Sequence, residues 1–244
     1  MSIKIIPLSE GSFTVDKSKQ FIPFNKQSDE MQERSAGSLL VEIQPFALVT
    51  SKDVIVIDTG LGYKNADGVM QIHQNLIDNG IEAGKITKVL ISHLHKDHAG
   101  GITIDKKKLS FPNAIYYVGR QELNFALDKK NTSYIKEDFE ALQNNPQVQL
   151  LAEEGTIDEY ISYKTSGGHC PYHIVYWIKE NSQVIFFGGD VAPQLQQMKS
   201  RFVAKYDYDG KKSMELRTDW WQRAQQQNWT LLFYHDIKSP YISL

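Results

Sequence analysis

Short apolar runs separated by turn residues dominate the first part of the chain. Residues 39–60 contain three such runs, broken near Pro45 and again by Ser-Lys-Asp at 51–53. Runs of this length between turn residues are typical of β-strands. Residues 86–92 and 114–118 have the same character, so we predict buried strands there as well.

A different periodicity marks residues 67–80. Apolar residues recur here with the spacing of one face of an α-helix, at Val69, Ile72, Leu76 and Ile77. The segment ends on Gly80, and glycine commonly terminates helices. His73 lies in the middle of this predicted helix, so we assign it a structural role on a surface or partly buried face.

The rest of the chain alternates between the two kinds of pattern. Helical patterns cover residues 120–128, 132–145 and 211–227. Strand patterns cover residues 148–151, 157–163, 174–179, 184–188 and 230–234. Interleaved strands and helices imply helices packed over sheets. The sequence contains no repeat, low-complexity tract or long linker, so we expect residues 1–244 to form a single domain.

Composition narrows the classes of partner. The 244 residues are 41% hydrophobic and 23% charged, as in ordinary globular proteins, with a formal net charge of −2. This balance gives no basic surface, so we expect no nucleic-acid partner. No run approaches the roughly 20 apolar residues of a membrane span, so we expect no membrane partner. The lack of a signal-peptide pattern and the single cysteine favour a cytoplasmic protein. We expect the protein to be a monomer or a homodimer.

Histidine and aspartate side chains concentrate at residues 93–98, His-Leu-His-Lys-Asp-His, which contain three of the seven histidines. Alternate side chains of a strand share a face, so we expect His93 and His95 to project from one side of a sheet edge. Asp97 and His98 are expected where the strand gives way to a loop, with Gly100–Gly101 allowing a sharp turn. Imidazole and carboxylate together suit zinc, and also iron or manganese. We interpret this cluster as a metal site.

Further ligands must come from elsewhere, because one strand end rarely completes a metal shell. Three other ligand-type residues lie beside apolar strands or among small residues: His169, Asp190 and His235. Each alone would more often be an ordinary loop or turn residue, but together with residues 93–98 they become candidate ligands. His173, four residues after His169, is assigned either a structural role or contact with a ligand.

The order of these residues resembles the metallo-β-lactamase-fold hydrolase superfamily. Asp58 matches the first motif of that family and residues 93–98 match the second; His169, Asp190 and His235 match the third, fourth and fifth. Residues 206–236 are more weakly similar to the branch of lactonases and methyl-parathion-hydrolase-like enzymes. The resemblance implies an α+β fold, an αβ/βα four-layer sandwich of two mixed β-sheets flanked by helices, with metals at one edge between the sheets.

The resemblance also implies a site for two divalent ions, zinc first, with iron or manganese as alternatives. His93, His95 and His169 would hold one ion, and Asp97, His98 and His235 the other. Asp190 would bridge the two ions, while Asp58 would hydrogen-bond a ligand or the loop that carries the ligands. The implied reaction is attack by a metal-bridging hydroxide on a small-molecule ester, lactone or organophosphate, with Asp97 and Asp190 as catalytic residues.

Two segments depart from the family pattern. Cys170, Pro171 and Tyr172 stand where many relatives have Thr-Pro-Gly, which adds bulk at the pocket rim and leaves Cys170 as either a reactive thiol or a small packing residue. Pro193 stands where quorum-quenching lactonases have a tyrosine. This difference weakens an acyl-homoserine-lactone assignment without excluding other lactones or esters.

Two other functions are compatible with the same fold. A persulfide-dioxygenase-like oxidoreductase would use a single iron, and metal analysis would separate it from a hydrolase with two zinc ions. A binding protein without catalytic activity could also retain the fold, although all seven expected ligands are present here.

Overall fold

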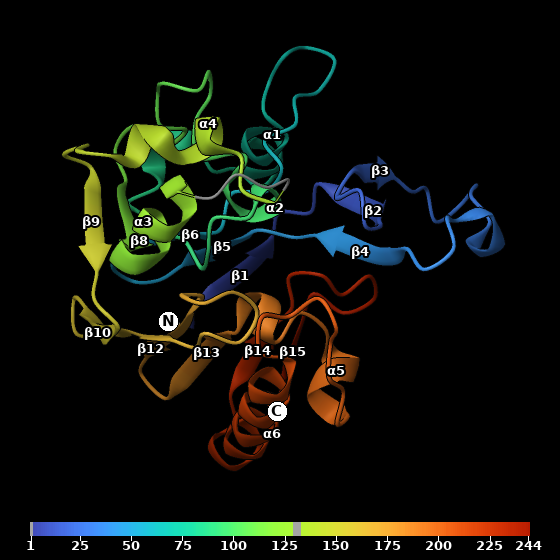
Figure 1. Cartoon of the computed structure of the whole chain (residues 1–244). Helices are drawn as coiled ribbons and strands as arrows, with labels where there is room; N and C mark the ends of the chain where they lie inside the picture. The colour runs from blue at the N-terminus through green and yellow to red at the C-terminus, as the bar shows by residue number, and fades with distance from the viewer. Residues whose placement is uncertain (1, 129–132) are drawn as a thin grey trace.

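The computed structural model describes residues 2–128 and 133–244, and two six-stranded β-sheets form its centre (Figure 1). In spatial order, the first sheet contains β1 (Lys4–Pro7), β5 (Phe46–Val49), β6 (Val54–Ile57), β7 (Lys88–Leu90), β8 (Ile115–Gly119) and β9 (Val148–Leu151). Strands β6 to β9 run parallel to one another, whereas β1 and β5 pair in the antiparallel direction.

The second sheet is also mixed. In spatial order, it contains β10 (Glu154–Ile157), β11 (Ile161–Thr165), β12 (Ile174–Glu180), β13 (Gln183–Phe187), β14 (Thr230–Leu232) and β15 (Tyr241–Ser243). Only β13 and β14 are parallel neighbours within it. A small third sheet, of β3 (Phe21–Pro23), β2 (Gly11–Val15) and β4 (Leu39–Ile43), extends away from the two layers as an arm (Figure 1).

Helices cover the outer faces of the two large sheets (Figure 1). The first sheet is covered by α1 (Gln71–Asp78), α3 (Arg120–Asp128) and α4 (Lys136–Phe139), and the second by α5 (Leu195–Lys199) and α6 (Gly210–Gln227). Short 3₁₀ turns connect elements: η1 (Met31–Glu33), η2 (Ala83–Lys85), η3 (Glu140–Leu142) and η4 (Gly189–Val191). The expected four-layer α+β sandwich is therefore confirmed. Within the described residues, none of the helices has the length and apolar character needed to cross a bilayer.

Alternation along the strands divides the core into three apolar layers. In β13, Ile185 and Phe187 face the space between the sheets, whereas Phe186 faces α6 and lies 4.9 Å from Trp220, ring centre to ring centre. In β8, Tyr117 faces the second sheet and its neighbours face the helices. Strands covered on both faces are apolar throughout, which explains why their sequences read as continuous runs.

Most predicted elements are present, but two segments differ. The predicted strand at 157–163 is a hairpin of β10 and β11, because Asp158 and Glu159 adopt positive φ angles of 46° and 65° and reverse the chain. The predicted helix at 132–145 is only α4 followed by η3; residue 132 lies outside the described residues. The helix is interrupted at Phe139, which has a φ of −132° and is completely buried in the core.

Candidate metal centre

Parallel strands of both large sheets end at one edge of the sandwich. Asp190 comes shortly after the end of β13 at Phe187, and His235 shortly after the end of β14 at Leu232. Because the carboxyl ends of parallel neighbours meet at the same sheet edge, these two residues lie together. The segment that follows β7 in the first sheet faces them across the sandwich.

The backbone of residues 91–99 differs from the sequence prediction. Strand β7 ends at Leu90, so His93 and His95 do not continue it, and Asp97 and His98 belong to a short helix, α2 (Lys96–Ala99), instead of a loop. Two side-chain carboxylates explain the change. Asp58 accepts the Ser92 N–H at 2.7 Å and Glu122 accepts the Leu94 N–H at 3.0 Å, so neither N–H pairs with a neighbouring strand.

The role predicted for the glycine pair also changes. Gly100 has ordinary helical angles, and what it requires is space: a Cβ there would lie 2.3 Å from the Leu61 carbonyl oxygen. A Cβ on Gly101 would lie 2.1 Å from the Thr59 oxygen. The pair therefore lets α2 pack directly against the loop that follows β6, which also carries Asp58.

The candidate ligand atoms form two adjacent groups. The three-histidine group consists of Nε2 of His93, Nδ1 of His95 and Nε2 of His169, with the His95 nitrogen 3.0 Å from each of the other two. The mixed group contains Asp97, His98 and His235. Its two Nε2 atoms lie 3.7 Å (His98) and 3.5 Å (His235) from Oδ2 of Asp97.

Asp190 lies between the two groups. Its Oδ2 is 3.3 Å from Nε2 of His169 and 4.0 Å from Nε2 of His93. Its Oδ1 is 3.1 Å from Nε2 of His98 and 3.0 Å from Nε2 of His235. One carboxylate thus directs one oxygen to each group.

Spacing and burial both fit divalent metal ions. In a tetrahedral site, zinc–nitrogen bonds of about 2.0–2.1 Å separate the ligand atoms by roughly 3.3–3.4 Å. Neighbouring candidate ligand atoms within the two groups lie 3.0 to 3.7 Å apart, which is close to that separation. Nε2 of His98 and Oδ1 of Asp190 are buried 3.1 Å apart, but neither has a partner with hydrogen-bond geometry in the described part of the chain. Buried polar atoms without a partner are rare, and a bound cation would satisfy both.

In four of the five candidate histidines, the ring nitrogen that faces away from the groups forms a hydrogen bond that orients the ring. These contacts join His93 to Ser92 Oγ (3.0 Å), His98 to Asp58 Oδ2 (2.8 Å), His169 to Asp207 Oδ1 (3.0 Å) and His235 to the Glu42 carbonyl oxygen (2.8 Å). When the outer Nδ1 carries the proton and donates it to these oxygens, the lone pair of Nε2 faces the group.

The electrostatics of the two groups differ. Burial, reinforced by the neighbouring His98 and His95, holds the pKa of His93 well below its usual value. Burial would also lower the pKa of His98, but Asp190, Asp97 and Asp58 outweigh it and raise that pKa well above the usual value. In the absence of metal, His98 therefore holds a proton that a cation must displace, whereas His93 is neutral.

His173 has a position that the sequence did not specify. Its Nε2 accepts the Asp190 N–H at 3.1 Å, and its Nδ1 lies 3.0 Å from Ser166 Oγ. Gly189 makes this approach possible, because a Cβ there would lie 2.5 Å from Nε2 of His173. His173 thus holds the backbone of Asp190. In the sequence, the Gly-Gly pair before Asp190 was the feature that could have indicated this close approach.

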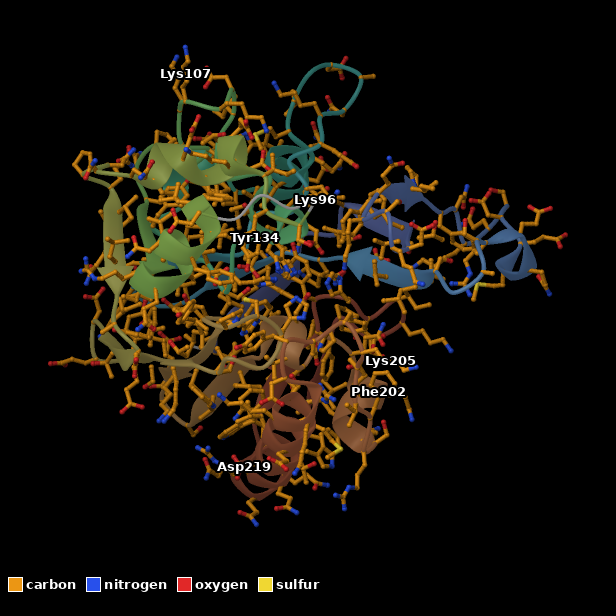
Figure 2. All side chains as sticks on the ribbon, viewed as in Figure 1. Lys96, Lys107, Tyr134, Phe202, Lys205 and Asp219 are labelled. Atoms are coloured by element: carbon orange, nitrogen blue, oxygen red, sulfur yellow. The ribbon has the colours of Figure 1, made fainter. Side chains whose placement is uncertain are left out.

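Two further segments flank the centre. On one side the arm contacts α2, where Lys96 Nζ lies 5.4 Å from the ring centre of Phe21. On the other side the ring of Tyr206 lies 6.2 Å from that of His169, and 39% of the tyrosine surface is exposed. Figure 2 shows Lys96 in the upper layer and Phe202, from the segment that carries Tyr206, in the lower one.

Comparison with known proteins is consistent with this geometry. Residues 41–235 match the family model described as the metallo-beta-lactamase superfamily. A search of curated proteins found no match.

Several solved structures are similar in fold. A probable metal-dependent hydrolase from Staphylococcus aureus is 22% identical, with a TM-score of 0.80 over 99% of this chain and 92% of that one. The hydrolase AbOPH of the beta lactamase superfamily is 23% identical, with a TM-score of 0.78 over 99% and 89%. AidC, a dizinc quorum-quenching lactonase, is 17% identical, with a TM-score of 0.75 over 98% and 90%. The family model spans most of the chain and all seven candidate ligands from His93 to His235, and the protein belongs to the metallo-beta-lactamase superfamily.

Proposed function

We propose that this protein is a hydrolase that holds two divalent ions and cleaves a small ester, lactone or organophosphate. Zinc is the metal that we propose for both ions. His93, His95 and His169 would hold one ion, and Asp97, His98 and His235 the other. The observation that carries the proposal is the position of Asp190, whose two oxygens lie within 3.3 Å of nitrogens from different groups.

Ions bound there would supply Lewis acidity and lower the pKa of a bound water toward neutrality. The chain supplies charge balance and orientation. Burial would raise the pKa of Asp190, but His235, His98 and His169 outweigh it and hold that pKa well below the usual range, so the carboxylate stays ionised. Asp97 adds a second anion to the mixed group and helps to orient the water.

Tyr206 is positioned to contact a substrate. Partial burial is the main cause that raises the pKa of Tyr206 to about 12, although a hydrogen bond from Gln197 opposes it. The phenol therefore keeps its proton at neutral pH and donates a hydrogen bond to a substrate oxygen. Exposed Phe202 and Val203 in the same segment favour a substrate with an apolar substituent. Solved structures of similar fold include lactonases, which supports the lactone and ester part of the proposal.

The alternative of a single-iron oxidoreductase remains a proposal for the same fold. The complete mixed group argues against it, because Asp97, His98, Asp190 and His235 all lie within reach of one ion. Metal analysis of protein purified without added metal separates the two functions. Two zinc ions per chain favour hydrolysis, and one iron favours oxygen chemistry.

Replacement of Asp190 tests the proposed function. Asp190→Ala should lose one or both ions and reduce kcat/KM by about 100-fold or more on a panel of lactones, aryl esters and aryl phosphotriesters. Asp219→Ala is the matched control, because Asp219 is an exposed carboxylate on α6, toward the bottom of the molecule in Figure 2. Undiminished turnover by Asp190→Ala would refute the mechanism.

A further inference from the structure

A buried carboxylate lies behind the three-histidine group. Glu122 is in the first turn of α3, and only 1% of its surface is exposed. Within the described residues, no lysine or arginine forms an ion pair with it. Burying a carboxylate is costly unless other groups compensate it, so the contacts of Glu122 need an explanation.

Three hydrogen-bond donors converge on this carboxylate. The Leu94 N–H lies 3.0 Å from Oε1, and the Tyr134 hydroxyl lies 3.2 Å from the same oxygen. The Cys170 thiol lies 3.6 Å from Oε2. Glu122 thereby joins three segments that are far apart in the sequence.

Each donor belongs to a segment that positions the three-histidine group. Leu94 lies between His93 and His95, and Cys170 directly follows His169. The ring of Tyr134 meets that of His95 edge to face, with the ring centres 4.7 Å apart. Glu122 therefore contacts the supports of all three histidines without touching their nitrogens.

His95 depends on these contacts more than the other ligands do. In the described part of the chain, no hydrogen-bond acceptor faces its outer nitrogen, whereas the other four candidate histidines each have one. Its orientation is set instead by the Leu94 backbone beside it and by the Tyr134 ring. Both of these are fixed by Glu122.

We propose that Glu122 is a positioning residue that sets the geometry of the three-histidine group and its affinity for metal. This inference rests on the proposed function, because it requires an ion in that group. Loss of the carboxylate removes the acceptor of the Leu94 N–H and one partner of the Tyr134 hydroxyl together, so the His95 nitrogen leaves its place 3.0 Å from those of His93 and His169. The mixed group has its own supports and keeps its affinity.

Stepwise metal affinity tests the proposal. Metal-free protein is titrated with Zn²⁺ against a chromophoric chelator, and Co²⁺ absorption bands report the ligand geometry at each site. Glu122→Ala should weaken one of the two binding steps by about 10- to 100-fold and leave the other within a few-fold. Glu122→Gln keeps the shape and one acceptor oxygen, so it should recover part of that loss.

The control is Asp138→Asn. Asp138 is another buried carboxylate in the same helical layer, but its carboxylate pairs with Lys106. Near-ultraviolet circular dichroism checks folding; if Glu122→Ala does not fold, Glu122→Gln and Tyr134→Phe decide the outcome. Tyr134→Phe should weaken the same step as Glu122→Gln.

The outcomes separate this inference from the proposed function. Equal affinities in the wild type and the Glu122 variants, or equal losses at both steps, would overturn the positioning role and leave the proposed function standing. A wild-type protein that binds no metal would overturn both. A selective loss at one step, with an altered Co²⁺ spectrum, supports the inference.

Discussion

Asp58 and His98 form a buried hydrogen-bonded pair, with 2.8 Å between the carboxylate Oδ2 and the histidine Nδ1. The same carboxylate accepts the N–H of Ser92 and its hydroxyl at 2.7 Å each. One side chain from the end of β6 thus orients a candidate ligand and the segment after β7. The two strands are parallel neighbours, so their ends lie close together and this connection is short.

We expect Asp58→Asn to weaken metal binding at the mixed group. An asparagine accepts the Ser92 N–H and tolerates the positive φ of 55° at this position, but it lacks the charge that holds the His98 proton. The affinity for one ion should fall by about 10-fold, measured by chelator competition. Asp53→Asn, at the opposite end of β6 and paired with Lys88, should bind both ions as the wild type does. Unchanged affinity in Asp58→Asn would contradict this role.

His173 should matter for stability through the backbone of Asp190. His173→Leu leaves the buried Asp190 N–H without an acceptor, which should cost about 1–3 kcal/mol of the free energy of unfolding in urea. His173→Gln can place an oxygen near the former Nε2 and should cost less. His73→Leu is the comparison, because His73 lies on α1, where its ring packs against Phe111. If His173→Leu is as stable as the wild type, this hydrogen bond does not contribute to the free energy of unfolding.

Glu10 gives the protein a defined pH dependence. Burial raises the pKa of Glu10 to about 7 from its ordinary value of 4.5, although its carboxylate accepts the Leu61 N–H at 2.6 Å. The unfolded chain loses this proton first, so the native state loses stability as pH rises from about 4.5 to about 7, by up to about 3 kcal/mol.

Glu10→Gln removes that titration. We expect the variant to match the wild type near pH 4.5 and to be more stable by about 1–3 kcal/mol at pH 8, because the glutamine amide oxygen still accepts the Leu61 N–H and carries no charge. Denaturant unfolding of both metal-free proteins across this range measures the difference. A stability difference that does not change with pH would show that Glu10 titrates normally.

Gly100→Ala should be strongly destabilising. Its Cβ would meet the backbone oxygen of Leu61 at 2.3 Å, which cannot move without separating α2 from the loop after β6, and the Lys96 oxygen of α2 itself at 2.6 Å. The expected loss is about 3 kcal/mol in the free energy of unfolding. Gly68→Ala is the control, since Gly68 has a φ of 78° but no atom within 4 Å of the added carbon, so only the backbone strain of about 1 kcal/mol remains. Similar losses in the two variants would show that close packing at Gly100 is unimportant.

The sequence predicted the candidate ligands because their residue types are unusual next to strands. His93 to His98 form a dense cluster, and Asp190 and His235 follow apolar runs directly. The supports behind the ligands have no such signature. Asp207 and Glu122 lie in segments that carry no motif, and they reach the site only because α3 and the segment before α6 pack against it.

Secondary structure was predictable where hydrophobic periodicity determines it. The β10–β11 turn was missed because Asp158 and Glu159 adopt left-handed angles without a glycine to signal them. The strand predicted to continue to His93 ends at Leu90, because tertiary contacts compete with the sheet. There, Asp58 and Glu122 capture backbone N–H groups that local sequence would assign to strand pairing.

Anomalous diffraction at a metal absorption edge tests the central claim most directly, on crystals of the protein loaded with Zn²⁺. We expect two anomalous peaks, one among His93, His95 and His169 and one among Asp97, His98 and His235, with the Asp190 carboxylate between them. No peak, a single peak, or peaks away from Asp190 would contradict the account.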